Sequence, residues 1–117
     1  MDKDLGDDEP QVETARIPLT LKITDEATFG LESLIDPGAS HNFISFEAWQ
    51  TLPNGSMVPT NATVTAINGT RTRPIGYVTL DVMIAKHVLQ VRFYVMPAGT
   101  MQEQVILGCS WCYLTNY

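Results

Sequence analysis

The chain is poor in positive charge, in cysteine and in long apolar runs. Its 117 residues hold only seven Lys and Arg against 13 Asp and Glu, and only two cysteines. The sequence has no basic patch, which argues against nucleic acid as a direct partner. A membrane-spanning helix is excluded because no run of about eighteen apolar residues occurs. The first ten residues are acidic and lack the apolar stretch of a signal peptide, so we expect an intracellular, cytoplasmic protein.

The negative charge is concentrated in the first 14 residues. This segment carries a net charge of −5, whereas the rest of the chain carries −1. A block of like charges with little apolar content cannot bury a core, so residues 1–14 are expected to form a flexible acidic leader. The hydrophobic fraction of 44% is enough for one small folded domain, which we place at residues 15–117.

The two cysteines, Cys109 and Cys112, form a C-x-x-C pair. A redox pair of this kind needs a strand-to-helix position early in a βαβ unit, which this sequence does not offer. A zinc site would need further ligands, and His41 and His87 lie far apart in the sequence. We therefore interpret the cysteines as packed thiols in a reducing compartment, and we predict no metal and no cofactor.

Most of the domain alternates apolar and polar residues with a period of two, which is typical of half-buried strands. This alternation predicts strands at 16–24, 61–67, 77–84 and 88–95, and apolar runs predict two more at 29–35 and 105–107. The first two segments are expected to pair as a hairpin, and so are the fourth and fifth. The pattern predicts an all-β fold, a small barrel or a sandwich.

A short helix is predicted at 45–52. Ser45 is a suitable N-cap, and Glu47 lies in the first turn, where the helix dipole favours a negative charge. Pro53 and Gly55 end the segment. A further helical turn or two is expected at 110–117.

The most informative stretch is 34–45, where an apolar strand ends in Asp36 and a tight turn with Gly38 follows. A glycine two residues after a carboxylate lets the backbone approach it and offer N–H groups. Two such carboxylates at close range cannot both ionise and must share a proton. The pair then supplies one acid and one base, which can activate a water and protonate a leaving group.

This stretch closely resembles the signature of the retroviral-type aspartic proteases (retropepsins), above all the protease segment of long-terminal-repeat (gypsy-like) retrotransposon polyproteins. The matching residues are Leu34-Ile35-Asp36, Gly38-Ala39-Ser40 and His41-Asn42-Phe43-Ile44. A second match, Val105-Ile106-Leu107-Gly108 followed by Trp111, is similar to the C-terminal motif and short helix of the family. Between them, 66–76 resembles the flap hairpin, so that the resemblance covers about residues 16–114.

The resemblance implies an all-β, small closed barrel with a flap hairpin and one or two short helices. It implies that Asp36 is the catalytic carboxylate, in an active-site loop that also contains Pro37, Gly38, Ala39 and Ser40. Leu107 and Gly108 are implied to support this loop. The implied flap residues, which cover an extended peptide substrate, are Ile67, Asn68, Gly69, Thr70, Ile75 and Gly76.

The family works as a homodimer in which each chain contributes one Asp, and this chain has one such motif after an apolar strand. The resemblance therefore implies an aspartic endopeptidase that processes a retrotransposon polyprotein. The alternative is a catalytically weak or inactive module of the same fold, which serves as a dimerisation or peptide-binding domain.

Pro37 departs from the family pattern, which has Ser or Thr at this position. In the family, that hydroxyl and its backbone N–H tie the two active-site loops together across the dimer, and proline supplies neither group. The family also has a further C-terminal strand at the dimer interface, and none is recognised before Tyr117. We therefore expect a weak dimer, in which strand 16–24 carries more of the association.

Overall fold

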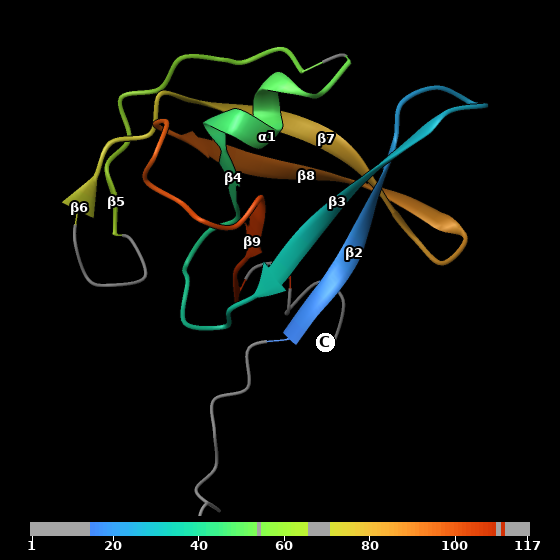
Figure 1. The fold of residues 1–117 in the computed structure, drawn as a ribbon, viewed down its shortest axis with the longest axis horizontal. Coiled ribbons are helices and arrows are strands. Elements are labelled where there is room, and N and C mark those ends of the chain that lie inside the picture. The colour runs from blue at the N-terminus through green and yellow to red at the C-terminus, as the bar shows by residue number, and fades with distance from the viewer. Residues whose placement is uncertain (1–14, 54, 66–70, 110, 112–117) are drawn as a thin grey trace, which may run out of the picture.

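The computed structural model describes residues 15–53, 55–65, 71–109 and 111. Six strands close into a barrel in the order β2-β3-β9-β4-β8-β7 (Figure 1). Their bounds are β2 Ala15–Lys22, β3 Thr28–Ile35, β4 Phe43–Ser45, β7 Gly76–Ile84, β8 His87–Met96 and β9 Val105–Leu107. The prediction of an all-β closed barrel is confirmed.

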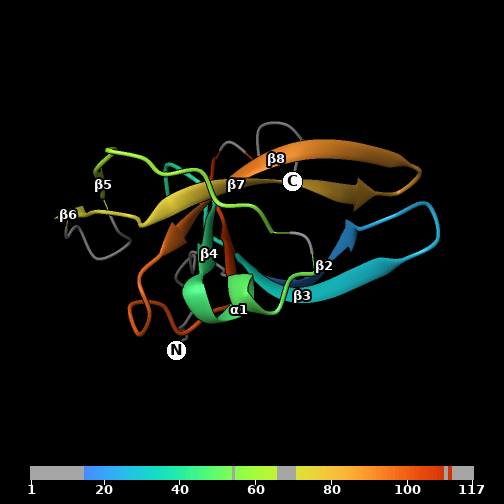
Figure 2. The same cartoon turned by 90° about the horizontal axis from the view of Figure 1, so that it is seen from above.

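Two long antiparallel hairpins make up most of the barrel. β2 pairs with β3 from Ala15↔Ile35 to Lys22↔Thr28, and β7 pairs with β8 from Gly76↔Val95 to Ile84↔His87. Both hairpins were predicted from the sequence, and every second residue of β2 and β3 on the inner side is buried or half-buried. Figure 2 shows both hairpins extending toward the same end of the molecule, and a short β2–β7 pairing joins them.

The short strands β4 and β9 complete the barrel between the hairpins. β9 runs parallel to β3 and antiparallel to β4, and β4 runs parallel to β8. All three residues of each short strand are buried. Burial on both faces explains why 105–107 is a continuous apolar run rather than an alternating one.

The helix α1 (Phe46–Gln50) follows β4 without a loop. Its N-cap is Ser45, as predicted, and the Ser45 side chain accepts a hydrogen bond from the N–H of Ala48 at 3.0 Å. The helix is shorter than the predicted 45–52 because Thr51 already serves as its C-cap. Of the second predicted helix, 112–117 and residue 110 lie outside the described residues.

Two other predictions need correction or lie outside the described part. The strand predicted at 61–67 is limited, among the described residues, to β5 (Val64–Thr65), which pairs with β6 (Arg71–Thr72) in a separate two-stranded sheet. Residues 61–63 are not in a strand, so their Thr-rich alternation misled the prediction. The acidic leader, 1–14, lies outside the described residues.

The barrel interior is filled by one apolar cluster. Its most deeply buried large side chains include Phe93, Leu21, Ile44 and Leu107. Burial of such side chains supplies the main favourable free energy of folding. Within the described part of the chain, no helix is long and apolar enough to cross a membrane.

Candidate active site

Asp36 lies at the end of β3, where the parallel pairing with β9 stops. Ile35 is in register with Leu107, and the N–H of Asp36 donates a hydrogen bond to the carbonyl oxygen of Leu107 at 2.9 Å. Leu107 and Gly108 therefore lie directly beside the residue that the sequence singled out. The Asp36 side chain is half-buried.

The turn after Asp36 closes around its own carboxylate. Oδ1 of Asp36 accepts a hydrogen bond from the N–H of Gly38 at 3.0 Å, and the N–H of Ala39 donates to the Asp36 carbonyl at 2.9 Å. A Cβ atom on Gly38 would lie only 3.2 Å from Oδ1. Glycine thus allows the close backbone approach that the sequence predicted. Pro37 and Gly38 are exposed, so this turn is open to a second molecule.

Gly108 lies against the backbone of the same turn. A Cβ atom there would come within 2.2 Å of the His41 carbonyl oxygen and 2.6 Å of the Ala39 carbonyl oxygen. The N–H of Cys109 donates to the Ala39 carbonyl at 2.8 Å. The two backbones are therefore in contact at a distance that no residue other than glycine permits at position 108.

Asn42 is the residue of this site that the sequence reasoning missed. It is 6% exposed, and its Oδ1 accepts a hydrogen bond from the N–H of Gly108 at 2.8 Å. Its Nδ2 donates to the Arg92 carbonyl at 3.4 Å, and its own carbonyl accepts from the N–H of Tyr94 at 2.9 Å. The sequence signal that could have identified Asn42 is its position directly before an apolar strand, because a polar side chain that is buried there needs hydrogen-bond partners.

An apolar cluster adjoins the turn on the side away from the barrel core. Its buried members are Ala39, Phe43, Val64, Met96 and Ile106, with Tyr94 and Met101 packed against them. Ala39 comes from the Asp36 turn and Val64 from β5, so the turn and the two-stranded sheet are packed into the same cluster. These buried side chains anchor the turn through Ala39.

The predicted flap residues are divided between two places. Ile67, Asn68, Gly69 and Thr70 lie outside the described residues, between β5 and β6. Ile75 and Gly76 do not belong to the two-stranded sheet: Gly76 begins β7 opposite Val95, and the N–H of Ile75 donates to the Val95 carbonyl at 2.9 Å. A Cβ on Gly76 would lie 2.5 Å from Met57, so close packing in the barrel explains this glycine.

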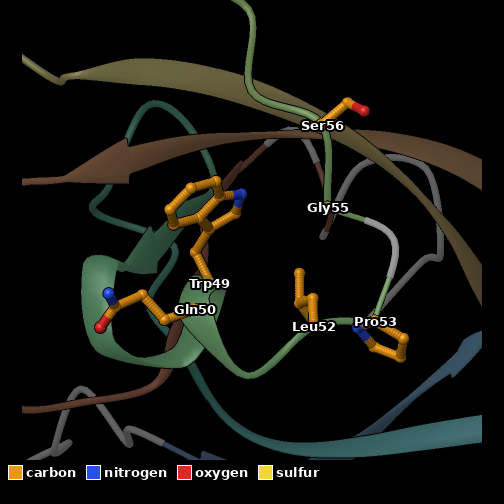
Figure 3. Close-up of a pocket in the computed structure, with 6 residues that line it drawn as sticks. All are labelled: Trp49, Gln50, Leu52, Pro53, Gly55 and Ser56. Carbon is orange, nitrogen blue, oxygen red and sulfur yellow. The ribbon is translucent and has the colours of Figure 1, made fainter.

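Other features lie apart from Asp36 or carry no ligand chemistry. A pocket of about 580 Å³ is lined by Trp49, Gln50, Leu52, Pro53, Gly55 and Ser56 (Figure 3), and none of these residues belongs to the Asp36 turn. No group of three His, Cys, Asp or Glu among the described residues could hold a metal ion. Cys109 is a free thiol, and it is exposed rather than packed as predicted, because it follows the point where β9 leaves the barrel.

Comparison with known proteins places this geometry in context. Residues 32–116 match the family described as the PEG10/RTL1 protease domain. No curated protein sequence matches the chain. Among solved structures, the EIAV protease in complex with the inhibitor HBY-793 is similar over 90% of each chain, with a TM-score of 0.69 at 12% identity.

A second solved structure has the same fold. The retroviral protease-like domain of Ddi1 from Leishmania major matches 91% of this chain and 77% of its own, with a TM-score of 0.58 at 13% identity. At these identities the likeness concerns the fold alone. The closed barrel described above is therefore the fold of retroviral proteases, as the sequence resemblance predicted.

Proposed function

Because the chain belongs to the PEG10/RTL1 protease-domain family, of retrotransposon origin, we propose that it is an aspartic endopeptidase that acts as a homodimer with one Asp36 from each chain. The observation that carries the proposal is the Asp36 turn. It holds a half-buried carboxylate at the end of a strand, next to Gly108, on a turn whose outer residues are exposed. A second copy that meets the first at this turn brings the two carboxylates together.

The proposed chemistry needs the two carboxylates to share one proton. The ionised Asp36 takes a proton from a water molecule, whose oxygen forms a bond to the carbonyl carbon of the scissile peptide. The protonated Asp36 of the other copy gives its proton to the carbonyl oxygen. When the C–N bond breaks, the proton taken from water passes to the leaving nitrogen, and a hydroxyl proton of the intermediate returns to the other Asp36, which re-forms the carbonyl and the starting state of the pair. Two carboxylates at close range are suited to this division of roles because they cannot both ionise.

The proposed substrate is an extended peptide from a retrotransposon polyprotein. The exposed residues Pro37, Gly38 and Ser40 lie on the Asp36 turn, while Ala39 of the same turn is buried in an apolar cluster that also contains Val64 of β5. An extended peptide that lies across the exposed face of the turn would be held by main-chain hydrogen bonds.

Pro37 favours a second candidate function. It is exposed on the turn that would meet the other copy, yet it has neither a hydroxyl nor a backbone N–H to offer across the interface. In this alternative, the domain binds extended peptides, or dimerises weakly, without turnover. Both candidates use the same site and differ in whether Asp36 performs chemistry.

A cleavage assay with an Asp36→Asn variant separates the two candidates. The probe is a mixture of internally quenched peptides, and the control is Asp81→Asn, which alters a half-buried carboxylate on β7. An enzyme loses all turnover with Asp36→Asn, keeps it with Asp81→Asn, and is inhibited by a statine-type transition-state mimic. A binding module has no turnover to lose and still binds the peptides after Asp36→Asn. Equal turnover by the wild type and Asp36→Asn would contradict the proposed mechanism.

A further inference from the structure

The loop that carries Asp36 has to cross the end of another strand. It leaves β3 and enters β4, and β9 lies between these two strands in the barrel (Figure 1). We call residues 36–42 the Asp36 loop and residues 107–109 the crossing segment, because the chain that leaves β9 passes against this loop. The position of Asp36 therefore depends on how the crossing segment is held.

Four hydrogen bonds join the crossing segment to the Asp36 loop. At the start of the loop, Asp36 donates to the carbonyl of Leu107. In the middle, the N–H of Cys109 donates to the carbonyl of Ala39. At the end, the N–H of Gly108 donates to Oδ1 of Asn42 at 2.8 Å, in a buried position. The fourth is long and exposed, and runs from Sγ of Cys109 to the carbonyl of Ser40 at 3.8 Å. The bond to Asn42 is the one that depends on a side chain of the loop.

We propose that Asn42 is a positioning residue for Asp36, which it holds in place through the N–H of Gly108. This inference rests on the proposed function. Gly108 is packed tightly against the loop, since a Cβ atom on it would lie 2.2 Å from the carbonyl oxygen of His41. If Gly108 can no longer donate its hydrogen bond to Asn42, its buried N–H is left without an acceptor, and Gly108 can move only away from the loop. Leu107 and Cys109, which bond directly to Asp36 and Ala39, then move with it. Misplacement of a catalytic group by about 1 Å can lower the rate roughly 10²-fold.

The amide group of Asn42 suits this role because it faces an N–H on one side and a carbonyl on the other. Oδ1 accepts from Gly108, while Nδ2 donates to the carbonyl of Arg92 on β8. A protonated carboxyl offers the same acceptor and donor, whereas an ionised carboxylate offers acceptors only. Leucine has a similar size and offers neither. The positioning role therefore requires a hydrogen-bond acceptor and a donor at position 42, whereas filling a buried space requires only a side chain of suitable size.

The test uses the full 117-residue chain with two substitutions at one position and a control. Asn42→Leu removes both hydrogen bonds, and Asn42→Asp keeps them when the carboxyl is protonated. The control is Ser33→Ala, because Ser33 is also buried and its hydroxyl donates one hydrogen bond, to the Ile17 carbonyl at 2.8 Å. Turnover is measured on a quenched peptide that the wild type cleaves, and amide exchange of Gly108 and Cys109 is measured by NMR.

We expect Asn42→Leu to lower kcat about 10²-fold with KM changed less than about twofold, because the exposed residues of the turn are unchanged. Asn42→Asp should approach the wild-type kcat at about pH 4, where a buried carboxyl is protonated, and fall behind it as the pH rises. Ser33→Ala should keep the wild-type kcat at both pH values. If Asn42 only filled a buried space, Asn42→Leu would instead have a higher kcat than Asn42→Asp at every pH.

The exchange measurement makes the inference testable without turnover. In the wild type, the amides of Gly108 and Cys109 should be protected, and in Asn42→Leu they should exchange faster while barrel amides such as that of Val91 do not change. If the wild type cleaves no peptide, the proposed function fails, and the exchange data still decide whether Asn42 holds the crossing segment. Unchanged exchange, or a kcat for Asn42→Leu equal to that of Ser33→Ala, would overturn the inference.

Discussion

Two glycines next to Asp36 act through the side chain that they lack. Gly38 leaves room for its N–H to reach Oδ1 of Asp36 at 3.0 Å, and Gly108 leaves room for the carbonyls of Ala39 and His41. At Gly108 the neighbouring atoms belong to the backbone, and the Ala39 carbonyl also accepts a hydrogen bond from the N–H of Cys109, so a methyl group would meet atoms that have little freedom to move. At the residue scale, the geometry of the site is therefore determined by close backbone contacts at these two glycines.

We expect Gly108→Ala to destabilise the fold by about 1–3 kcal/mol or more, because the added methyl group overlaps two backbone carbonyls in a packed site. Gly30→Ala is the control, since a Cβ atom at Gly30 meets nothing within 4 Å, and it should change stability by less than about 0.5 kcal/mol. Urea denaturation of both variants measures the difference. Equal midpoints would show that the crossing segment has more freedom than the hydrogen bonds indicate.

At the scale of elements, α1 is too short to be stable by its own hydrogen bonds. It has five residues, whereas isolated helices shorter than about 12 residues are marginal in water. Its stability comes from contacts: Ala48 is buried in the barrel core, Trp49 packs against that core, and Ser45 caps the helix while it is still the last residue of β4. One serine thus joins a barrel strand to the helix without a loop.

Ser45→Ala should destabilise the protein by about 1 kcal/mol, within the range of 0.5–2 kcal/mol for loss of an N-cap. The N–H of Ala48 would lose its acceptor in a buried position, where an unpaired donor is costly. Ser56→Ala, at an exposed serine, is the control and should leave the unfolding midpoint within error. A wild-type midpoint for Ser45→Ala would mean that packing alone holds α1 in place.

At the scale of the whole molecule, the proposed activity depends on association of two copies. Pro37 is exposed at the proposed meeting point of the two Asp36 loops. Relative to Ser or Thr, each copy lacks a hydroxyl and an N–H. With about 0.5–1.5 kcal/mol for each lost hydrogen bond, the two copies together lose about 2–6 kcal/mol of association free energy.

Pro37→Ser should therefore tighten the dimer by at least about 30-fold and raise turnover at a fixed concentration. The wild type should be mostly monomeric at micromolar concentration. Sedimentation equilibrium and the peptide-cleavage assay measure the two effects, and Asp36→Asn in the Pro37→Ser background separates association from chemistry, because it should dimerise without turnover. A tight wild-type dimer that Pro37→Ser leaves unchanged would show that other contacts hold the two copies together.

The sequence by itself determined the features that depend on neighbours along the chain. Period-two alternation and one apolar run identified the two long hairpins, Ser45 was recognisable as an N-cap, and the contiguous residues around Asp36 carried the resemblance to the retropepsins. These signals are local, because the direction of side chains along a strand and the capping of a helix are set within a few residues. The same local reasoning extended the strand at 61–67 too far.

The tertiary structure alone decided what joins distant parts of the chain. It placed β9 between β3 and β4, and it brought the N–H of Gly108 to the side chain of Asn42 across 66 residues of sequence. It also assigned Gly76 to the barrel, against Met57. A polar side chain at the start of an apolar strand gives no indication of which backbone group will satisfy it. The partner is fixed only when the barrel closes, because closure brings the backbone N–H of Gly108 next to the buried amide of Asn42, which needs a hydrogen-bond donor.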